Sequence, residues 1–253
     1  MKLLAFDTST DTMSIAVTDG SGTWQHTGPG GAKSSATLIP AIQSLMAEAG
    51  LALRDLDAIV FGRGPGSFTG LRTACSVAQG LAFGADVKVL PVDTLMALAE
   101  EARWKNVQAG RVDAAMPCRI TALLDARMDE MYVQTYDFSE AGWASGETCV
   151  LVRPEMLAPG ECVEWLAGNV FAPYAERLSA SVMAMPRIET LPTAAAMLRL
   201  APALATAGAC VSADLALPVY VRDKVAQTTE ERTRIKADAV RVAAEALAAP
   251  SNS

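Results

Sequence analysis

A glycine-rich turn at residues 62–66 of the 253-residue sequence has residue types that could bind a ligand. Gly62, Gly64 and Gly66 follow a short apolar run and precede a proline-free stretch with helical spacing. Free N–H groups and the helix dipole favour an anion such as phosphate at the start of a helix. The Walker and dinucleotide patterns are both incomplete, because the lysine of the first and the last glycine of the second are missing. Phosphate binding and a close approach of the backbone to another segment both remain interpretations.

Two turns rich in acids and hydroxyls are the other candidates for chemistry. Residues 7–11 read Asp-Thr-Ser-Thr-Asp, and residues 125–130 read Asp-Ala-Arg-Met-Asp-Glu. Paired acids such as those of the second turn could bind Mg²⁺ or act as general acid and base. Alternatively, Asx and Ser/Thr turns would explain the first turn, and an ion pair from Arg127 to its neighbouring acids would explain the second. We expect Asp7 and Asp125 to be structural, so that an Asn replacement costs only a modest amount of stability.

Metal and nucleophile chemistry find little support in the sequence. His26 is the only histidine, and the five cysteines are scattered without a C-x-x-C pair. We therefore expect no metal, no cofactor and reduced thiols in the cytoplasm. No apolar run reaches membrane-spanning length and no signal peptide precedes the strand that starts at Lys2, so no membrane association is expected. The net charge of −7 argues against broad nucleic-acid binding by this chain alone, so a partner should supply the basic surface for RNA.

The elements that would position these residues alternate between strands and helices. Strand 58–61, helix 67–83 and strand 88–92 form a βαβ unit, which implies a parallel sheet covered by helices. Gly84 is expected to end that helix, and the polar stretch 106–117 is expected to separate two lobes. The other expected strands are 2–6, 13–18, 24–27, 119–124, 131–138 and 147–152, and the other helical segments are 34–49 (bent at Pro40), 94–103, 154–157, 193–207 (interrupted at Pro202) and 235–249.

Three motifs resemble the TsaB family, whose members are paralogues of the catalytic subunit TsaD. They are GRGPGSFTGLR followed by AQGLAFG in residues 62–84, DARMDEMY in residues 125–132 and LPVYVRD in residues 217–223. The resemblance implies the two-lobed actin/Hsp70/sugar-kinase-like (ASKHA) α/β fold, with mixed sheets, helices and an abbreviated second lobe. The expected lobes are 1–107, which carries the glycine turn, and 108–225, and residues 226–253 are expected to be a tail with an extra helix.

The same resemblance implies a subunit required for threonylcarbamoylation of N6 of adenosine 37 in tRNAs that read codons beginning with A. Such a subunit binds and activates a TsaD-like catalytic subunit and does not catalyse the reaction. A TsaE-like ATPase joins the ternary complex, tRNA binds only through the complex, and a homodimer can form in isolation. Two other classes stay open. One is a small ATPase or sugar kinase of the same superfamily, and the other is a metallopeptidase, which would need a ligand cluster or a nucleophile with a histidine base.

Individual positions match the superfamily's nucleotide site as remnants. They are Asp7, Thr8, Ser9, Asp125 and Gly168. Two features of the relatives are absent, because Thr94 and Leu98 stand where TsaD has a His-x-x-x-His pair, and residues 34–36 read Ser-Ser-Ala where the family usually has His-Ser-Glu. These departures argue against a metal site and leave any family role of that histidine or glutamate without a counterpart here.

The helix after the glycine turn is expected to have one face for the sheet and another for a partner. At 100° per residue, the sheet-facing arc contains Gly70, Leu71, Ala74, Val77, Ala78 and Leu81. The opposite arc contains Thr69, Thr73, Ser76 and Gly80, with Arg72 as the only charge in the helix. Small residues spaced four, three and four apart suit two closely packed helices. The partner helix could belong to another protein, as in the TsaB family, or to residues 36–49 of the same chain.

Overall fold

The computed structural model describes residues 1–160 and 162–222, and residues 1–221 form one compact unit with two sheets. The expected tail helix at 235–249 lies outside the described residues. The first sheet has the strand order β3-β2-β1-β4-β5. β1 pairs antiparallel with β2 and parallel with β4, so the sheet is mixed. Its strands are β1 (Leu3–Asp7), β2 (Thr12–Thr18), β3 (Thr23–Pro29), β4 (Ala58–Gly64) and β5 (Lys88–Asp93).

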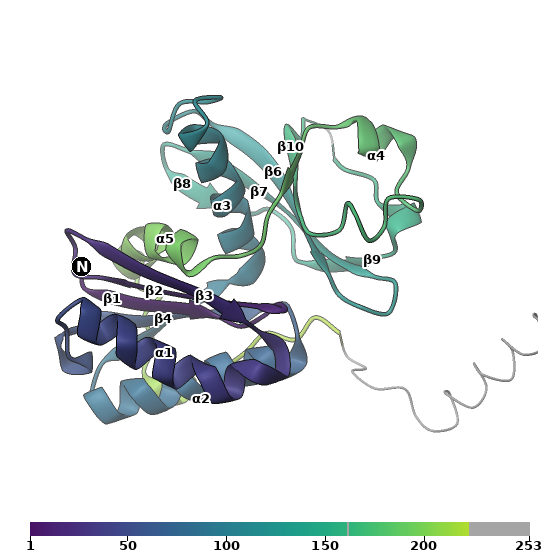
Figure 1. Ribbon diagram of the computed structural model, residues 1–253. Coiled ribbons are helices and arrows are strands. Elements are labelled where there is room, and N and C mark those ends of the chain that lie inside the picture. The colour runs from purple at the N-terminus through teal and green to yellow at the C-terminus, as the bar shows by residue number, and fades with distance from the viewer. Residues whose placement is uncertain (161, 223–253) are drawn as a thin grey trace, which may run out of the picture. The chain divides into compact units, whose positions relative to one another are not determined.

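Helices cover both faces of this sheet (Figure 1). On one face lie α1 (Ser34–Glu48) and α2 (Phe68–Ala85), and on the other lies α5 (Ala194–Thr206). The central strands are buried on both faces, as their continuous apolar runs predict: every residue of β1 is buried. Phe6 and Phe61 belong to the core under α1 and α2, whereas Ala5 and Val60 belong to the core under α5.

The second sheet has the order β11-β10-β6-β7-β8, and β9 pairs with β7. Its strands are β6 (Cys118–Asp125), β7 (Met131–Ser139), β8 (Gly142–Ala144), β9 (Val150–Val152), β10 (Trp165–Gly168) and β11 (Arg187–Glu189). α3 (Thr94–Gln108) packs against this sheet, and its buried residues Leu95, Leu98 and Ala102 share a core with β6 and β7. The short α4 (Ala180–Ala184) belongs to a separate core on the far side of the same sheet.

A buried carboxylate joins α3 to α5 and β8. Glu100 of α3 is 2% exposed and accepts hydrogen bonds from Trp143 Nε1 at 3.0 Å and Arg199 Nε at 2.8 Å. It also pairs with Arg103 at 2.9 Å, one turn further along α3. A buried charge is tolerated only when it is paired and hydrogen-bonded. Glu100 therefore fixes the second sheet and α3 against α5, which packs on the first sheet.

Several expected element boundaries are wrong in instructive ways. Gly84 lies inside α2, which ends where Asp86 takes the left-handed conformation (φ 55°). Pro202 lies inside α5 without interrupting it. The expected cap is present, because the Thr193 side chain accepts a hydrogen bond from Ala196 N. α1 follows a 3-10 turn at Gly31–Lys33, so its first residue, Ser34, bonds back to Gly31 instead of acting as an N-cap.

Other boundaries shift without changing the order of the elements. α3 continues beyond residue 103 to Gln108, which shortens the irregular stretch before β6 to residues 109–117. The strand expected at 147–152 is limited to β9, and the helical turn expected at 154–157 is a 3-10 helix at Pro154–Met156.

Candidate functional site

The glycine turn packs directly against the backbone of the first acidic turn. A Cβ at Gly70 would lie 1.8 Å from the carbonyl oxygen of Thr8, and a Cβ at Gly66 would lie 2.6 Å from the Ser9 Cβ. The two segments are also hydrogen-bonded, from Ser67 N to Ser9 O at 2.8 Å and from Thr8 Oγ1 to Gly70 O at 2.7 Å. Of the two interpretations of the glycines, close approach of the backbone is the one that these contacts support. The space at the start of α2 is filled by Thr8 and Ser9.

Asp7 is buried at the end of β1 beside this junction. Its side chain is 1% exposed, and Oδ1 accepts hydrogen bonds from Ser9 N at 2.9 Å and Ser9 Oγ at 2.6 Å. Oδ2 faces Gly62, where a Cβ would lie only 1.9 Å away, and it has no hydrogen-bond partner among the described residues. Burial raises the pKa of Asp7 to about 6, although the hydrogen bonds from Ser9 and, to a smaller extent, the Thr94 hydroxyl act in the opposite direction.

The second acidic turn connects β6 to β7 and is tied to its own sheet. Asp125 Oδ1 accepts hydrogen bonds from the Tyr174 hydroxyl at 2.8 Å and from Arg127 N at 2.9 Å. The Asp125 amide donates to Asn169 Oδ1 at 2.9 Å. The hydrogen bond to Asp125 helps to raise the pKa of Tyr174 to about 12, although burial contributes more. Asp125 therefore serves as a hydrogen-bond hub that connects the turn to the segment after β10.

Gly168 is the last residue of β10, next to Asn169. It has a φ of +157°, and a Cβ there would lie 1.8 Å from the Leu123 carbonyl oxygen of the neighbouring strand β6. A side chain at this position is therefore excluded by the strand beside it. The packing against β6 is enough to explain why residue 168 is a glycine, and no bound nucleotide is needed for that explanation.

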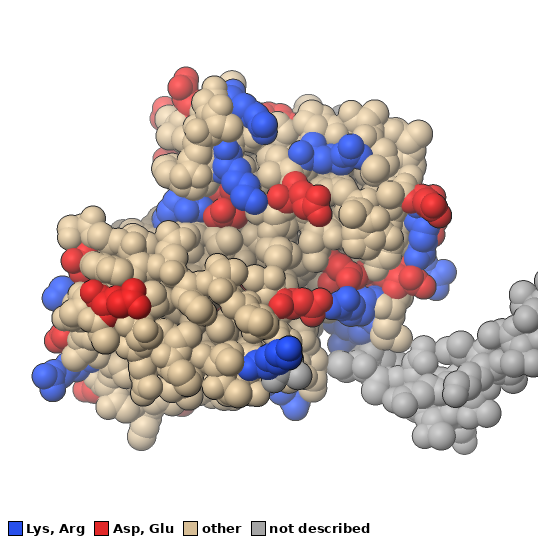
Figure 2. All heavy atoms as spheres, in the orientation of Figure 1, with Lys and Arg blue, Asp and Glu red and all other residues tan. Residues whose placement is uncertain are grey.

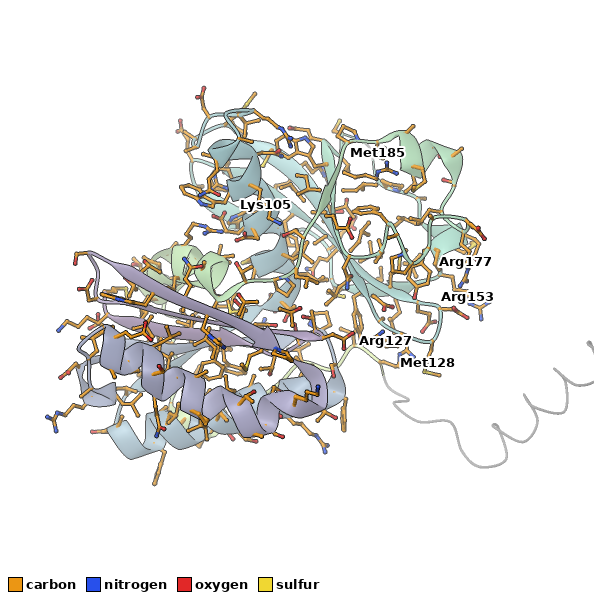
Figure 3. The ribbon with its side chains drawn as sticks, in the orientation of Figure 1. Lys105, Arg127, Met128, Arg153, Arg177 and Met185 are labelled. Carbon is orange, nitrogen blue, oxygen red and sulfur yellow. The ribbon has the colours of Figure 1, made fainter. Side chains whose placement is uncertain are left out.

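An arginine joins the two acidic turns. Arg127 pairs with Asp11 of the first turn and, at 3.5 Å, with Asp125 of its own turn. Hydrogen bonding to Asp11 raises the pKa of the Arg127 guanidinium. Figure 3 shows Arg127 and Met128 at the tip of the β6–β7 hairpin, where Arg127, Met128 and Asp129 all have positive φ values of 61°, 54° and 62°. The five residues that the sequence suggested as remnants of a nucleotide site therefore lie in the two acidic turns and at the end of β10. There they contact other parts of the protein.

The outer face of α2 is open. Thr69, Arg72, Ser76 and Gly80 are exposed and Thr73 is half-buried, and we call these five residues the α2 outer face. They lie opposite the buried residues Gly70, Leu71, Ala74, Cys75, Ala78 and Ala82. α1 packs beside α2, and Thr69, Ser76 and Gly80 stay exposed, whereas Arg72 Nε donates a hydrogen bond to the Tyr220 hydroxyl at 3.3 Å. Val77 and Leu81 of the expected sheet-facing arc are half-buried and pack at the margin of the core, while Cys75 and Ala82, which were not expected in that arc, are buried.

The last described segment runs beside α2 and extends its outer face. Ala216 O accepts hydrogen bonds from Gln79 Nε2 at 2.9 Å and Cys75 Sγ at 3.2 Å. Further on, the Tyr220 ring packs on Phe68 with a centroid distance of 5.3 Å, and Arg72 lies 3.9 Å above the Phe68 ring centre. This segment leaves three large apolar side chains exposed next to α2: Leu215, Leu217 and Tyr220.

A family model described as "TsaD: tRNA N6-adenosine threonylcarbamoyltransferase" matches residues 26–169. The tRNA threonylcarbamoyladenosine biosynthesis protein TsaB of Escherichia coli K12 is 34% identical over 89% of this chain and 96% of its own length. The TsaB protein of Haemophilus influenzae is 33% identical over 89% of this chain and 95% of its own length. This chain belongs to the TsaB family.

A solved structure confirms the fold of this TsaB-family chain. YeaZ from Pseudomonas aeruginosa superposes with a TM-score of 0.75 at 35% identity, covering 87% of this chain and 99% of the YeaZ chain. The expected fold class is confirmed: two mixed sheets with covering helices in the ASKHA arrangement of the TsaD and YeaZ relatives.

Metal-binding features are absent from the part of this TsaB-family chain that the structure describes. In residues 1–160 and 162–222, no group of three or more His, Cys, Asp or Glu side chains could hold a metal ion. Thr94 and Leu98, at the positions of the TsaD histidine pair, are both fully buried. His26 lies exposed on β3. Across the same residues, no helix is long and apolar enough to cross a membrane.

Sequence reasoning missed the contribution of residues 213–222 to the surface around α2. The motif at 217–223 marked this segment as similar to the family, but its residue types do not indicate whether Leu215, Leu217 and Tyr220 are buried or exposed. The usable signal was proline: Pro218 follows Leu217 and favours an extended, unpaired backbone. Figure 2 shows a largely uncharged surface over the neighbouring α1, so low charge extends across this side of the molecule.

Proposed function

We propose that this chain is a non-catalytic subunit that binds and activates a TsaD-like catalytic subunit. The reaction is the threonylcarbamoylation of N6 of adenosine 37 in tRNAs that read codons beginning with A. Membership of the TsaB family, whose curated members are named tRNA threonylcarbamoyladenosine biosynthesis proteins, supports a role in this modification. The structure adds two arguments, one against chemistry by this chain and one for a docking surface.

The argument against chemistry is that the candidate residues are either buried or bonded to protein groups. Asp7, Thr8 and Ser9 are 1%, 0% and 3% exposed, so a nucleotide cannot reach them without rearrangement of the glycine turn. Asp125 is held by Tyr174 and its own turn. A small ATPase or sugar kinase of the same superfamily would need these groups free for phosphate and magnesium.

The argument for docking is the composition of the α2 outer face. Exposed helix faces ordinarily carry Lys and Glu, but Thr69, Ser76 and Gly80 are small and uncharged. Small residues let the backbone of a second helix come close, and the adjacent Tyr220 and Leu217 supply apolar area. We assign this face to the TsaD-like subunit. In isolation, a second copy of this chain would occupy it as a homodimer, whereas a TsaE-like ATPase and tRNA would bind only to the assembled complex.

Co-expression with the TsaD homologue of the same source tests the proposal. Size-exclusion chromatography should give a single peak that contains both chains, and the purified complex should modify tRNA faster than the TsaD homologue alone when the TsaE homologue and the threonylcarbamoyl adenylate are supplied. Separate elution of the two chains at micromolar concentration would contradict the binding claim. Equal modification rates with and without this chain would contradict the activation claim.

A further inference from the structure

β3 forms an open edge of the first sheet. It pairs with β2 on one side, and no other described strand pairs with it. Gly30 N donates to Asp11 O at 2.7 Å, and these residues lie opposite each other in the register that pairs Thr12 with Pro29. Hydrogen-bonded pairs alternate along an antiparallel ladder. The backbone groups of Trp24, His26 and Gly28 therefore point to β2, and those of the residues between them point outward.

The outward-facing residues are Thr23, Gln25, Thr27 and Pro29. Proline fits this assignment, because within sheets it is found where its missing N–H would face away from the ladder. Within the part of the chain that the structure describes, Thr23, Gln25 and Thr27 thus each offer an unpaired backbone donor and acceptor. The strand carries no Lys, Asp or Glu, although charged side chains are the usual protection of an exposed edge against added strands.

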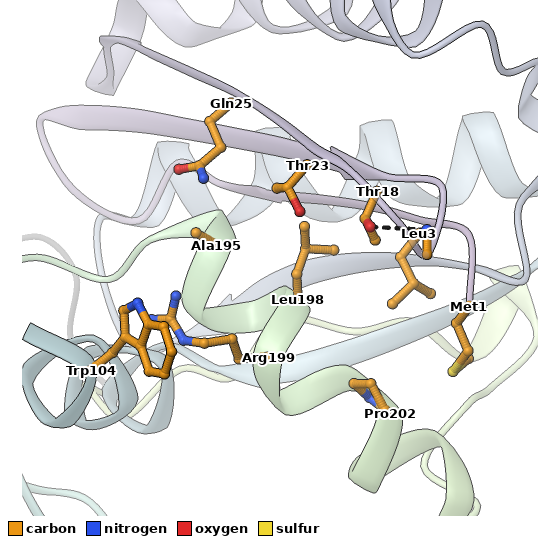
Figure 4. A pocket seen from close by; sticks show the side chains of 11 residues that line it. Met1, Leu3, Thr18, Thr23, Gln25, Trp104, Ala195, Leu198, Arg199 and Pro202 are labelled. Carbon is orange, nitrogen blue, oxygen red and sulfur yellow. Dashed lines mark hydrogen bonds between the residues drawn. The ribbon is translucent and has the colours of Figure 1, made fainter. Parts of the chain in front are cut away.

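A groove lies beside this edge, on the face of the sheet that α5 covers (Figure 4). It has a volume of about 370 Å³ and lies between the strands and α5. Thr18, Thr23 and Gln25 line it from the sheet, Leu198 and Arg199 from α5, and Trp104 from α3. Because side chains alternate in direction along a strand, Thr23 and Gln25 present their side chains to the groove and their backbone groups to the open edge.

The groove has two charged groups among its described lining residues, the Arg199 guanidinium and the amino terminus of Met1. Arg199 is the only charged side chain among its described lining residues, and it is already paired with Glu100 at 2.8 Å and Glu101 at 2.7 Å. The guanidinium also lies 5.1 Å from the centre of the Trp104 ring. Next to Arg199 a charged ligand side chain would gain no free partner, whereas an uncharged side chain could pack on Leu198 and Trp104 and bond to Gln25.

From these observations we infer that β3 and this groove bind an extended, uncharged segment of a partner protein by adding it to the sheet as a further strand. The backbone of the segment pairs with Thr23, Gln25 and Thr27, and one side chain of every two enters the groove. Pro29 limits the pairing at one end, and the turn before Thr23 limits it at the other, so the recognised core is about five residues long. The site is separate from the α2 outer face, which lies on the opposite side of the sheet.

Selection of displayed random seven-residue peptides on the full-length chain tests the inference. Enriched peptides should carry uncharged, partly apolar residues at alternate positions. Binding of a selected synthetic peptide should fall at least tenfold in Gln25→Pro, which removes an outward-facing donor that the β2 ladder does not use. Gln25→Lys should weaken binding to a similar extent, because it places a charge in the groove.

The matched control is His26→Lys, whose side chain lies on the other face of β3, and it should retain binding. Thermal unfolding should show that all three variants remain folded.

Hydrogen exchange measured by NMR locates the bound peptide. In the free chain the amides of Thr23, Gln25 and Thr27 should exchange quickly, and the selected peptide should slow them without changing those of Trp24 and His26. Three results would overturn the inference: no enrichment over the unselected library, binding that both Gln25 variants retain, or outward amides that are already protected in the free chain because another part of it fills the edge.

Discussion

Two regions of α2 use small residues for opposite purposes. Gly66 just before the helix and Gly70 in its first turn let the backbone touch Thr8 and Ser9, and the contact is closed to solvent and ligands. Two to three turns later, Ser76 and Gly80 are equally small but face outward, and nothing lies within 4 Å of the position that a Cβ at Gly80 would take. Residue type alone therefore does not distinguish a packed junction from an open surface. The difference is whether another segment lies opposite the glycine, as the turn with Thr8 and Ser9 does at Gly66 and Gly70.

The largest expected effect comes from replacing the two helix glycines in turn. Gly70→Ala would bring a Cβ within 1.8 Å of a carbonyl oxygen, so the helix or the first turn must move, and we expect a loss of at least about 3 kcal/mol in the free energy of unfolding. Gly80→Ala is the control, with a gain of about 0.5–1 kcal/mol from helix propensity. Urea denaturation of the isolated chain measures both. Equal effects at the two positions would show that the junction is not tightly packed.

A pH-dependent effect is expected at Asp7. Burial raises the pKa of Asp7 to about 6 in the folded chain, compared with about 4 in the unfolded chain. Between pH 4 and pH 6, Asp7 is therefore more often protonated in the folded state than in the unfolded state. The stability that protonated Asp7 gives to the folded state is thus fully present below pH 4 and is lost as the pH rises through 6. Asp7→Asn removes this loss, and its stability relative to wild type should rise by about 2–3 kcal/mol between pH 4 and pH 8.

For Asp7 the structure thus changes the expectation from sequence, which was a modest loss of stability on replacement by Asn. The measurement is urea denaturation of both proteins at several pH values. A difference between the two proteins that does not vary with pH would contradict the raised pKa of the buried carboxyl.

Asp125→Asn should have a smaller effect. Asn keeps an oxygen that can accept from the Tyr174 hydroxyl and Arg127 N, and it loses the charge beside Arg127, for a cost of about 1 kcal/mol. The complex with the TsaD homologue should still assemble and modify tRNA at a similar rate. A hundredfold lower modification rate in an intact complex would mean that this carboxylate takes part in the chemistry.

No effect at all is expected when nucleotide is added to the isolated chain. The first turn and the glycine turn fill the site that phosphate would occupy, so titration calorimetry with ATP and Mg²⁺ should give no binding heat and the chain should hydrolyse ATP at the background rate. Micromolar binding would favour the kinase or ATPase class and would require the glycine turn to open.

Much of the fold was predictable because its signals are local. The apolar runs at 58–61 and 88–92, the glycine turn and the period of α2 predicted a βαβ unit that the structure contains. The end of α2 was not predictable from Gly84, because the nearby Asp86 can adopt the left-handed conformation that stops the helix. The contents of the site were less predictable. Whether Asp7 is a ligand or a buried turn residue depends on Gly62 and Gly70, which are more than fifty residues away in sequence.

Affinity between this chain and the TsaD homologue, measured for two arginine variants, tests the central claim most directly. Ser76→Arg places a long charged side chain in the middle of the α2 outer face, and Ala203→Arg places the same side chain at an exposed position on α5. Both isolated chains should remain folded. The dissociation constant should rise at least a hundredfold for Ser76→Arg, since a buried, unpaired charge costs several kcal/mol, and it should stay within threefold of wild type for Ala203→Arg. Wild-type affinity of a folded Ser76→Arg chain would contradict the proposal that the α2 outer face binds the catalytic subunit.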